Sequence, residues 1–490
     1  MPLDFDCYQA LAARDARFDG RFFVAVKSTG IYCRPICPAR TPRKSSCLFM
    51  ETAAAAERAG FRPCLRCRPE LAPSSPAASL EDALYADIRA RALHGDSVDE
   101  LAARAGFSAR QLRRLMVRAF GVTPVEIAQT ERLLFAKKLL QETALPTAQV
   151  ALSAGFGSVR RFNALFHTRY SLSPTALRRQ GGAGPRRDHA DTLKLRLGYR
   201  PPLAWRELLE YIARRSVPGV EFVDSDRGLY ARTVTLGKHT GWVQVERSGS
   251  GAWLEVTVPA TLAKVSWPLL TRLRAMFDLD ANPANIDEHL RADRLLAPGV
   301  KRHPGLRVPG AWEPFEIAVR AVLGQQISVA GASTLAARLA AKFGRPIETP
   351  FAWLNRLAPT SRALADAKPE EIAMIGLPRA RAVTLCDLAI AAERGGLAFA
   401  PAATVEEIVA ALCWIRGIGE WTAQYVAMRA LRFPDAFSAA DLGVRKALSS
   451  PGGSLPKEKQ VIARAAAWRP WRAYATLHLW QTLHDTPPRK

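Results

Sequence analysis

Four cysteines near the start of the chain are spaced to bind a metal ion. They form two close pairs, Cys33-x3-Cys37 and Cys64-x2-Cys67. Four thiolates at this spacing can surround one tetrahedral zinc ion, and in a chain without a secretion signal they favour a metal over disulfides. A closed zinc site that only holds a small fold together is the commoner alternative. The other cysteines have no such partner spacing and are expected to be ordinary buried or partly buried residues: Cys7, Cys47, Cys386 and Cys413.

A glycine-containing hairpin and a downstream acid form a second candidate site. The string IRGIGEWTA, residues 415–423, fits a helix-hairpin-helix. In it, Gly417 and Gly419 would let the backbone approach a phosphate, which the amides around Thr422 bind without reading base sequence. Asp441 follows in FSAADLGVRKAL, at the start of a new predicted helix. A carboxylate can stabilise a developing positive charge and orient or deprotonate water, whereas a helix N-cap, worth about 1 kcal/mol, is the alternative role.

Two similar stretches lie between these sites, AGFSARQLRRLMVRAFGVTP at 105–124 and AGFGSVRRFNALFHTRYSLSP at 154–174. Each places Gly-Phe and a short polar stretch before a basic helix, which is typical of a helix-turn-helix whose second helix enters the major groove. A solvated helix face is the alternative for any one residue of these helices. The residues expected to face DNA are Arg110, Gln111, Arg113 and Arg114 in the first copy, and Ser158, Arg160, Arg161 and Asn163 in the second.

The elements that must position these residues divide the chain into four parts. Stretches rich in proline, serine and glycine at 70–82 and 179–191 are predicted linkers. After the second, LYARTVTL, GWVQVERS and AWLEVTVPA alternate as antiparallel strands do, and from about residue 258 the pattern is helical. We expect a multidomain, mainly α protein with α+β parts. Its predicted domains are a small four-cysteine zinc domain at 1–72, an all-α double helix-turn-helix domain at 83–180, an antiparallel α+β domain at 191–305 and an all-α helix-hairpin-helix domain at 306–486.

The charge of the chain indicates a polyanionic partner. Sixty-nine Lys and Arg against 45 Asp and Glu give a net charge of +24 and a pI near 10.2, and the excess is spread along the chain. Such a pI marks a nucleic-acid partner more often than a merely solvated surface, although charge alone does not separate DNA from RNA or an anionic membrane. With 48% hydrophobic residues, the 490-residue chain excludes a single small module and wholesale disorder.

No stretch of the sequence is long and apolar enough to span a bilayer, and the first residues include early acids and no continuous apolar run. We therefore expect no membrane partner and a cytoplasmic, nucleoid-associated protein.

The cysteine region resembles the N-terminal domain of the Ada adaptive-response proteins, through DGRFFVAVKSTGIYCRPICPAR and AGFRPCLRCRPEL within residues 1–70. The resemblance implies that Cys33 takes a methyl group from a methylphosphotriester in the DNA backbone. It also implies backbone contacts from Thr29, Arg40 and Arg62, with a solvated surface charge as the alternative for each arginine. Because a zinc-bound sulfur can stay ionised and nucleophilic, the transfer is chemically reasonable. Methylation removes one negative charge, so we expect tighter DNA binding afterwards.

The paired helical motif resembles the AraC-type DNA-binding domain, most clearly in the GF…F…SP pattern of the second copy. The resemblance implies sequence-specific binding to promoter DNA, with RNA polymerase as a partner.

Residues 191–484 resemble the AlkA-type 3-methyladenine DNA glycosylases of the helix-hairpin-helix superfamily. The likeness includes GLRVPGAWEPFEIAVRAVLGQQISV at 305–329, the hairpin, the Asp441 segment and PWRAYATLHLW at 470–480. It implies hydrolysis of the N-glycosidic bond of alkylated bases, with Asp441 as the catalytic carboxylate. An N-alkylated purine already carries positive charge and leaves readily, so the barrier lies in the oxocarbenium-like sugar.

The same resemblance implies a base pocket. A base must be extruded from the duplex before the enzyme can reach it, and a cationic base is well recognised by aromatic faces. Trp421, Tyr425 and Trp480 match aromatic positions around the family's pocket, with plain core as the alternative. Gln326 lies where the family inserts a residue into the gap left by the flipped base. Strand-cutting relatives carry a lysine nucleophile at the position of Trp421, so base release without strand cleavage is expected.

The sequence therefore predicts a bifunctional alkylation-damage response protein, in which a monofunctional glycosylase is joined to a zinc-dependent, methyl-accepting transcriptional regulator. The alternative is a regulator whose glycosylase-like half binds DNA without base excision.

Overall fold

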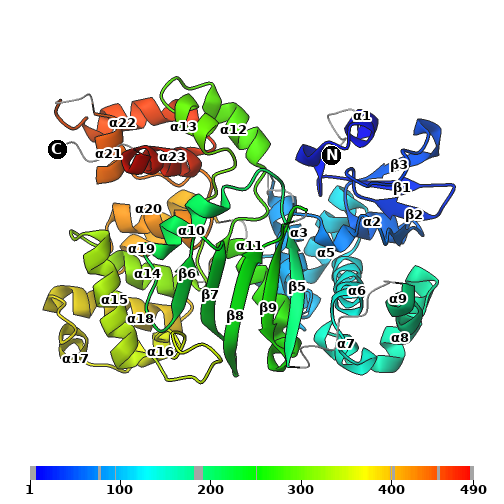
Figure 1. Ribbon diagram of the computed structural model, residues 1–490, viewed down its shortest axis with the longest axis horizontal. Coiled ribbons are helices and arrows are strands. Elements are labelled where there is room, and N and C mark those ends of the chain that lie inside the picture. The colour runs from blue at the N-terminus through cyan, green and yellow to red at the C-terminus, as the bar shows by residue number, and fades with distance from the viewer. Residues whose placement is uncertain are drawn as a thin grey trace.

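The computed structural model describes residues 7–74, 79–93, 95–180, 191–249, 251–397, 399, 403–449 and 453–485. Parts of both predicted linkers, residues 75–78 and 181–190, lie outside the described residues, as do the outermost ends of the first and last predicted domains. Figure 1 shows a small sheet and a group of helices on one side, a long central sheet, and a large helical region on the other side.

The N-terminal module is a four-stranded sheet with strand order β3-β1-β2-β4 and two helices. Its elements are α1 (Cys7–Ala12), β1 (Phe23–Val26), β2 (Ile31–Cys33), β3 (Cys47–Met50), α2 (Ala53–Arg58) and β4 (Arg62–Pro63). β1 is antiparallel to both β2 and β3, while β2 and β4 are parallel. The parallel pair brings the ends of β2 and β4 to the same edge of the sheet.

Seven helices follow and form two helix-turn-helix units around one long helix. They are α3 (Leu80–Arg91), α4 (Val98–Arg104), α5 (Ala109–Phe120), α6 (Pro124–Glu142), α7 (Thr147–Ser153), α8 (Val159–Tyr170) and α9 (Pro174–Gln180). Local sequence explains the tight turns: Ser108 begins α5 with a capping box, and Gly121 ends it with a positive φ of 68°. The second helix of each copied motif, α5 and α8, is the one predicted to read DNA.

A five-stranded antiparallel sheet with order β5-β9-β8-β7-β6 forms the centre of the molecule. Its strands are β5 (Thr192–Gly198), β6 (Glu221–Asp224), β7 (Leu229–Leu236), β8 (His239–Arg247) and β9 (Trp253–Pro259), with helices α10 (Trp205–Ala213), α11 (Ser266–Met276), α12 (Pro283–Arg291) and α13 (Ala297–Arg302).

The last part of the chain is helical. Its helices are α14 (Pro314–Leu323), α15 (Val329–Phe343), α16 (Ser361–Ala365), α17 (Pro369–Ala373), α18 (Arg379–Glu393), α19 (Val405–Cys413), α20 (Glu420–Arg429), α21 (Leu442–Ala447), α22 (Glu458–Ala465) and α23 (Arg472–Asp485). The predicted multidomain fold class, with a cysteine zinc module, an all-α pair, a sheet domain and a helical domain, is confirmed.

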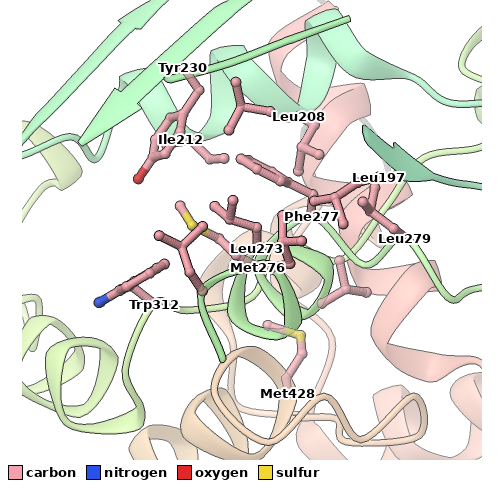
Figure 2. Close-up of a cluster of buried hydrophobic side chains, with 14 of the residues drawn as sticks. Leu197, Leu208, Ile212, Tyr230, Leu273, Met276, Phe277, Leu279, Trp312 and Met428 are labelled. Carbon is pink, nitrogen blue, oxygen red and sulfur yellow. The ribbon is translucent and has the colours of Figure 1, made fainter. Parts of the chain in front are cut away.

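The sheet domain and the helical domain share one hydrophobic core. Phe277 lies at its centre, fully buried, with edge-to-face contacts to Trp205 at 5.0 Å and to Tyr230 at 5.4 Å between ring centroids. Figure 2 shows Leu208 of α10 beside this cluster and Met428 reaching it from α20. The two C-terminal domains are therefore packed through apolar side chains, and this fixes α10 relative to α20.

A buried arginine joins the zinc module to the sheet domain. Arg200, after β5, is 1% exposed. Its Nε donates to the carbonyl of Asp19 at 2.9 Å and its Nη2 to the carbonyl of Ser74 at 2.9 Å, while Nη1 donates to the carbonyl of Asp280. The Asp19 carboxylate in turn binds Arg34. Although 70–82 was predicted to be a linker, its residue Ser74 is thus held inside this contact.

A second polar junction involves three parts of the chain. Glu142, at the end of α6, accepts hydrogen bonds from Arg68 of the zinc module at 2.5 Å and from the backbone N–H of Arg196 in β5 at 3.0 Å. It also pairs with Lys138 at 2.9 Å. Burial alone would raise the pKa of the neighbouring Glu70, but Lys137 and Arg68 outweigh it and lower this pKa to about 2. Buried ion pairs therefore join the zinc module to the helical pair, and a backbone N–H bond to Glu142 joins the helical pair to the sheet domain.

Within the described parts of the chain, no helix combines the length and the apolar composition needed to cross a membrane.

We predict that Arg200→Ala loosens the docked zinc module. The change leaves several buried carbonyls without a donor, each worth about 1–3 kcal/mol. The urea midpoint for detachment of the zinc module should fall. Limited proteolysis should release the N-terminal module faster than from the wild type. Arg206→Ala, which removes an exposed ion pair with Glu210 and Asp226, is the control and should behave as the wild type. Equal proteolysis of all three proteins would contradict the docking role of Arg200.

Candidate functional sites

The four predicted zinc ligands come together at one edge of the first sheet. Cys33 ends β2 and Cys64 follows β4, and the parallel register of these strands pairs Tyr32 with Pro63. The sulfur atoms of all four cysteines lie within 4.8 Å of one another. A tetrahedral zinc ion with bonds of about 2.3 Å holds its sulfurs about 3.8 Å apart, so the cluster fits zinc. The four cysteines, Cys33, Cys37, Cys64 and Cys67, form the zinc site that their spacing predicted.

Cys33 differs from the other ligands in exposure. It is partly exposed, whereas Cys37, Cys64 and Cys67 are buried. The Sγ of Cys67 also accepts a hydrogen bond from the backbone N–H of Arg34 at 3.3 Å. Of the four cysteines, the one predicted to accept a methyl group is therefore the residue with the largest exposed fraction.

The residues predicted to contact the DNA backbone lie in three segments of this module. Thr29 is exposed in the turn between β1 and β2, where its hydroxyl donates to the carbonyl of Val26 at 3.3 Å. Arg40 is exposed in the loop after Cys37, and Arg62 is half-buried in β4. Their contacts with DNA remain predictions.

In the first helix-turn-helix, the predicted DNA-reading residues line one exposed face of α5. Leu112 and Met116 are buried on the other face. Gln111 has a second task, because its Oε1 closes the capping box by accepting from the backbone N–H of Ser108 at 2.9 Å. The exposed residues are Arg110, Gln111, Arg113 and Arg114.

The second copy has the same arrangement in α8, where Phe162 and Phe166 are buried. Ser158 is the N-cap of α8 and accepts from the backbone N–H of Arg161 at 3.4 Å. Its hydroxyl therefore begins the helix, and base contact would be an additional task. The exposed residues on the predicted DNA side are Arg160, Arg161 and Asn163.

Asp441 is buried at the N-terminus of α21 with 8% of its surface exposed. Its Oδ1 accepts hydrogen bonds from the backbone N–H of Val444 and from the indole Nε1 of Trp480, both at 2.9 Å. Its Oδ2 accepts from Nε1 of Trp421 at 2.9 Å. A carboxylate has about four acceptor positions, so one position on Oδ2 remains for a substrate atom or a water molecule. Asp441 thus combines the N-cap role with a geometry suited to chemistry.

The predicted aromatic residues surround this carboxylate from two helices. Trp421 and Tyr425 of α20 stack on each other with ring centroids 5.5 Å apart and an angle of 16° between their planes. Trp480 of α23 stacks against Tyr211 of α10 at 6.2 Å and 13°. The sequence predicted stacking roles for Trp421 and Trp480, and the structure adds that both hold Asp441 through their indole N–H groups.

The hairpin lies between α19 and α20. Gly417 has a φ of 83°, and a Cβ there would lie 2.1 Å from Oγ1 of Thr384 in α18, so glycine is required by the protein's own packing. Gly419 is exposed, and a Cβ on it would meet open space. Thr422 is 2% exposed, and its Oγ1 accepts from Nε2 of Gln325 at 3.2 Å. Its side chain thus lies inside the protein, where it joins the hairpin to the loop after α14.

Gln326 lies in that loop. It is exposed and has a positive φ of 56°, a left-handed conformation that costs a non-glycine residue free energy. Gln325 beside it also donates to the carbonyl of Gly417 at 2.9 Å. The neighbouring Ile327 is an apolar side chain with 39% exposure. The loop therefore presents Gln326 and Ile327 to solvent next to the hairpin.

Two residues near the carboxylate escaped the sequence analysis. Arg429 lies one and two helical turns beyond Tyr425 and Trp421 on the same face of α20, and this spacing was the signal that could have identified it. Tyr211 comes from the sheet domain, and no local pattern connects it with Trp480.

Comparison with known proteins places each part of the chain. Residues 6–70 match the family described as the metal binding domain of Ada, and residues 101–180 match a helix-turn-helix domain. Residues 194–313 match the AlkA N-terminal domain, and residues 319–473 match the HhH-GPD superfamily of base excision DNA repair proteins.

Relatives and solved structures agree with these matches. A protein of Mycobacterium tuberculosis described as a probable bifunctional transcriptional activator/DNA repair enzyme AlkA is 38% identical, and the match covers 99% of each chain. The DNA-3-methyladenine glycosylase 2 of Escherichia coli is 35% identical over 58% of this chain and 96% of the relative. The structure of a 3-methyladenine DNA-glycosylase from Archaeoglobus fulgidus has the same fold, with a TM-score of 0.52 and 23% identity over 60% of this chain and 99% of that chain.

Fold and site together define a helix-hairpin-helix glycosylase scaffold joined to an Ada-type zinc module and a helix-turn-helix pair. The relative from Mycobacterium tuberculosis matches this chain along almost its whole length. The chain belongs to the family of bifunctional transcriptional activator/DNA repair enzymes of the AlkA type.

We predict that Gly443→Ala displaces Trp480 from Asp441. A Cβ on Gly443 would lie 2.8 Å from Nε1 of Trp480 and 3.1 Å from Oδ1 of Asp441, so the indole must move. A displacement near 1 Å in such a site costs about 100-fold in rate. We expect single-turnover base release to fall by about 10- to 100-fold, with DNA affinity nearly unchanged.

Gly299→Ala is the matched control for this variant. Its Cβ would approach α23 at an ordinary 3.7 Å from Nδ1 of His478, without a clash. Gly299→Ala should keep the wild-type rate, and a wild-type rate for Gly443→Ala would show that the indole bond to Asp441 does not matter.

Proposed function

We propose that the C-terminal half excises alkylated bases such as 3-methyladenine by hydrolysing their N-glycosidic bond, and that the N-terminal half senses methylphosphotriesters and regulates transcription. The observation that carries the excision activity is the Asp441 carboxylate, held by three N–H donors with one acceptor position free between aromatic side chains. A group held in this way is oriented before the substrate arrives, which favours electrostatic stabilisation of a transition state.

The proposed reaction at this site follows from the chemistry of the substrate. An alkylated base is cationic, so it leaves without a strong general acid, and positive charge develops at the sugar. The free position on Oδ2 of Asp441 stabilises that charge or orients the attacking water. The indole rings of Trp421 and Trp480 lie against the carboxylate, and aromatic faces suit a flat, flipped base.

Base release without strand cleavage is part of the proposal. Strand cleavage by a lyase step needs an amine that forms a Schiff base with the sugar. The residue that reaches Asp441 from the hairpin helix is Trp421, whose indole nitrogen is a hydrogen-bond donor only.

For the zinc module, we propose that Cys33 is the methyl acceptor. Its thiolate attacks the methyl carbon of the phosphotriester, forming an S–C bond while the O–C bond breaks and its electron pair stays on the phosphate oxygen. The four cysteines hold a zinc ion, which keeps a bound sulfur ionised near neutral pH. The products are a neutral thioether and an anionic phosphodiester, so the protein loses a negative charge where the DNA gains one. Contacts from Thr29, Arg40 and Arg62 would then hold the DNA more tightly.

The regulatory half of the proposal concerns promoter DNA. The exposed faces of α5 and α8 would enter adjacent segments of the major groove, through Arg110, Arg113 and Arg114 in the first and Arg160, Arg161 and Asn163 in the second. RNA polymerase would be the partner that this DNA-bound protein contacts. The contact would take place at the chromosome, in the cytoplasm.

The excision activity is tested with Asp441→Asn. Asparagine is an equally good N-cap, so the fold is kept while the carboxylate charge is lost. We expect abasic sites in methylated duplex DNA, revealed by heating in alkali, to form on the order of 100-fold more slowly than with the wild type.

Asp435→Asn is the control, because this carboxylate pairs with Arg469 and Arg472. It should release bases at the wild-type rate. If wild type and Asp441→Asn gave equal signals, Asp441 would not be the catalytic carboxylate. If the wild type bound methylated DNA but released no base, the C-terminal half would be a DNA-binding module only.

Methyl transfer is tested by mapping the modified residue. After exposure to DNA carrying methylphosphotriesters, mass spectrometry of the wild type should show one methyl group on the peptide containing Cys33. Cys413→Ser, which changes an exposed cysteine outside the cluster, should be methylated like the wild type, and Cys33→Ser should not be methylated. An unmodified Cys33 in the wild type would indicate a purely structural zinc site.

A further inference from the structure

A buried guanidinium lies behind the aromatic side chains of the glycosylase site. Arg429 of α20 is 4% exposed. Its Nη1 donates hydrogen bonds to two phenol oxygens, that of Tyr211 at 2.8 Å and that of Tyr425 at 2.5 Å. One side chain thus joins a tyrosine of the sheet domain to a tyrosine of the helical domain.

Each of these tyrosines supports one of the tryptophans that hold the carboxylate. Tyr425 stacks on Trp421, which donates to Oδ2 of Asp441, and Tyr211 stacks on Trp480, which donates to Oδ1. With Arg215 only 3.7 Å above its ring and 6% of its own surface exposed, Tyr211 offers little free face to a base. Its position suits the support of Trp480. The contacts close into a ring of six residues: Arg429, Tyr425, Trp421, Asp441, Trp480 and Tyr211.

The guanidinium is itself held to the segment between the two domains. Nε donates to the carbonyl of Pro309, and Nη2 donates to the carbonyl of Gly310 at 3.3 Å. The N–H of Gly310 donates to the carbonyl of Met276 in α11 at 2.8 Å, and a Cβ on Gly310 would lie 2.4 Å from the carbonyl of Ala275. The segment is therefore fixed against α11. Because Arg429 is bonded to this segment and to both tyrosines, it holds Tyr211 and Tyr425 in position relative to α11.

We propose that Arg429 is a positioning residue of the glycosylase, which sets the direction of the Asp441 carboxylate through the hydroxyl groups of Tyr211 and Tyr425. This inference rests on the proposed function of the site. It assigns the hydroxyl of Tyr211, on a domain outside the hairpin, a part in excision that neither the hairpin nor the Asp441 segment reveals. Arginine suits the task because its planar fork can serve two hydroxyls and two carbonyls at once, which a lysine ammonium cannot.

The charges around Tyr425 agree with this geometry. Burial alone would raise the pKa of its phenol, but Arg429 and Arg215, the hydrogen bond with Tyr211, and Arg320 of α14 together lower it to about 8. Burial dominates for Tyr211 and raises its pKa to about 12 in spite of Arg215 and Arg429. The lowered pKa favours the phenolate form of Tyr425, and the charge of that form would strengthen the bond to the guanidinium.

The decisive variant is Tyr211→Phe in the full-length protein. It keeps the ring that stacks on Trp480 and removes only the hydroxyl that Arg429 binds. We expect the single-turnover rate of 3-methyladenine release from methylated duplex DNA to fall by about tenfold, while the Kd for DNA containing an abasic site changes less than twofold. Arg429→Lys should give a similar loss. The double variant Tyr211→Phe/Arg429→Lys should be no slower than the slower single variant, because both changes break the same link.

Tyr474→Phe is the matched control. It removes a buried tyrosine hydroxyl that donates to Asp278 at 2.7 Å, and Tyr474 lies on α23 with Trp480. It should lower the melting temperature about as much as Tyr211→Phe and leave the single-turnover rate within twofold of the wild type. A rate loss in Tyr474→Phe equal to that in Tyr211→Phe would reduce the effect to general destabilisation and overturn the proposal.

A second measurement needs no substrate, so it separates this inference from the proposed function. The tyrosinate absorbance that wild type has and Tyr425→Phe lacks should appear near pH 8, and in Tyr211→Phe it should move to higher pH, because the hydrogen bond that favours the phenolate is gone. If this titration does not move and the rate of Tyr211→Phe equals that of the wild type, the proposal is wrong. If the wild type releases no base although the titration moves as expected, the ring exists and the proposed function fails instead.

Discussion

The arrangement of the C-terminal half depends on one carboxylate that is held by three N–H donors. The donors come from three helices: the first turn of α21, Trp421 of α20 and Trp480 of α23. Burying a carboxylate whose acceptor positions are unsatisfied costs folding free energy, so these three helices must converge within hydrogen-bond distance of Asp441. The hairpin, the glycine at position 443 and the stacked tyrosines each serve this convergence. It leaves a single acceptor position open, on Oδ2.

The regulatory half is attached to the sheet domain through both apolar and polar contacts. The second helix-turn-helix and α6 pack into the apolar core that the two C-terminal domains share, for example through Phe135 of α6 against Trp267 at 5.1 Å between ring centroids. Arg200 and Glu142 add buried charged groups between the zinc module, the helical pair and the sheet. Separating such groups exposes carbonyls and carboxylates that have lost their partners, so the interface is specific for one relative placement. The zinc cluster is therefore connected to the sheet domain by a short path of hydrogen bonds, from Cys67 through Arg34 and Asp19 to Arg200.

The sequence was sufficient wherever function depends on local spacing. The Cys-x3-Cys and Cys-x2-Cys pairs predicted the zinc cluster, and the two copied motifs predicted the helix pairs, because a few consecutive residues determine each of them. Contacts between distant segments could not be predicted this way: nothing near Tyr211 indicates that its ring supports Trp480, and nothing near Ser74 indicates that Arg200 holds it. For residues with two roles, the sequence predicted only one of them. Gly417 suits a phosphate-binding hairpin, but the close approach of Thr384 already requires glycine there, and Thr422 packs inside the protein against Gln325.

The positive charges near the site limit how it can choose its substrate. Arg429, Arg215 and Arg320 all act on Tyr425, so a cationic base entering beside this residue meets repulsion as well as aromatic faces. A pocket built mainly to attract cations would not place three guanidiniums there. The site does not need such attraction, because an alkylated base leaves readily while a normal base does not, and a carboxylate that stabilises the sugar accelerates both by a similar factor. Selectivity can then come from the reactivity of the glycosidic bond itself. The arginines are then not needed for selectivity and can hold the aromatic side chains and Asp441 in place.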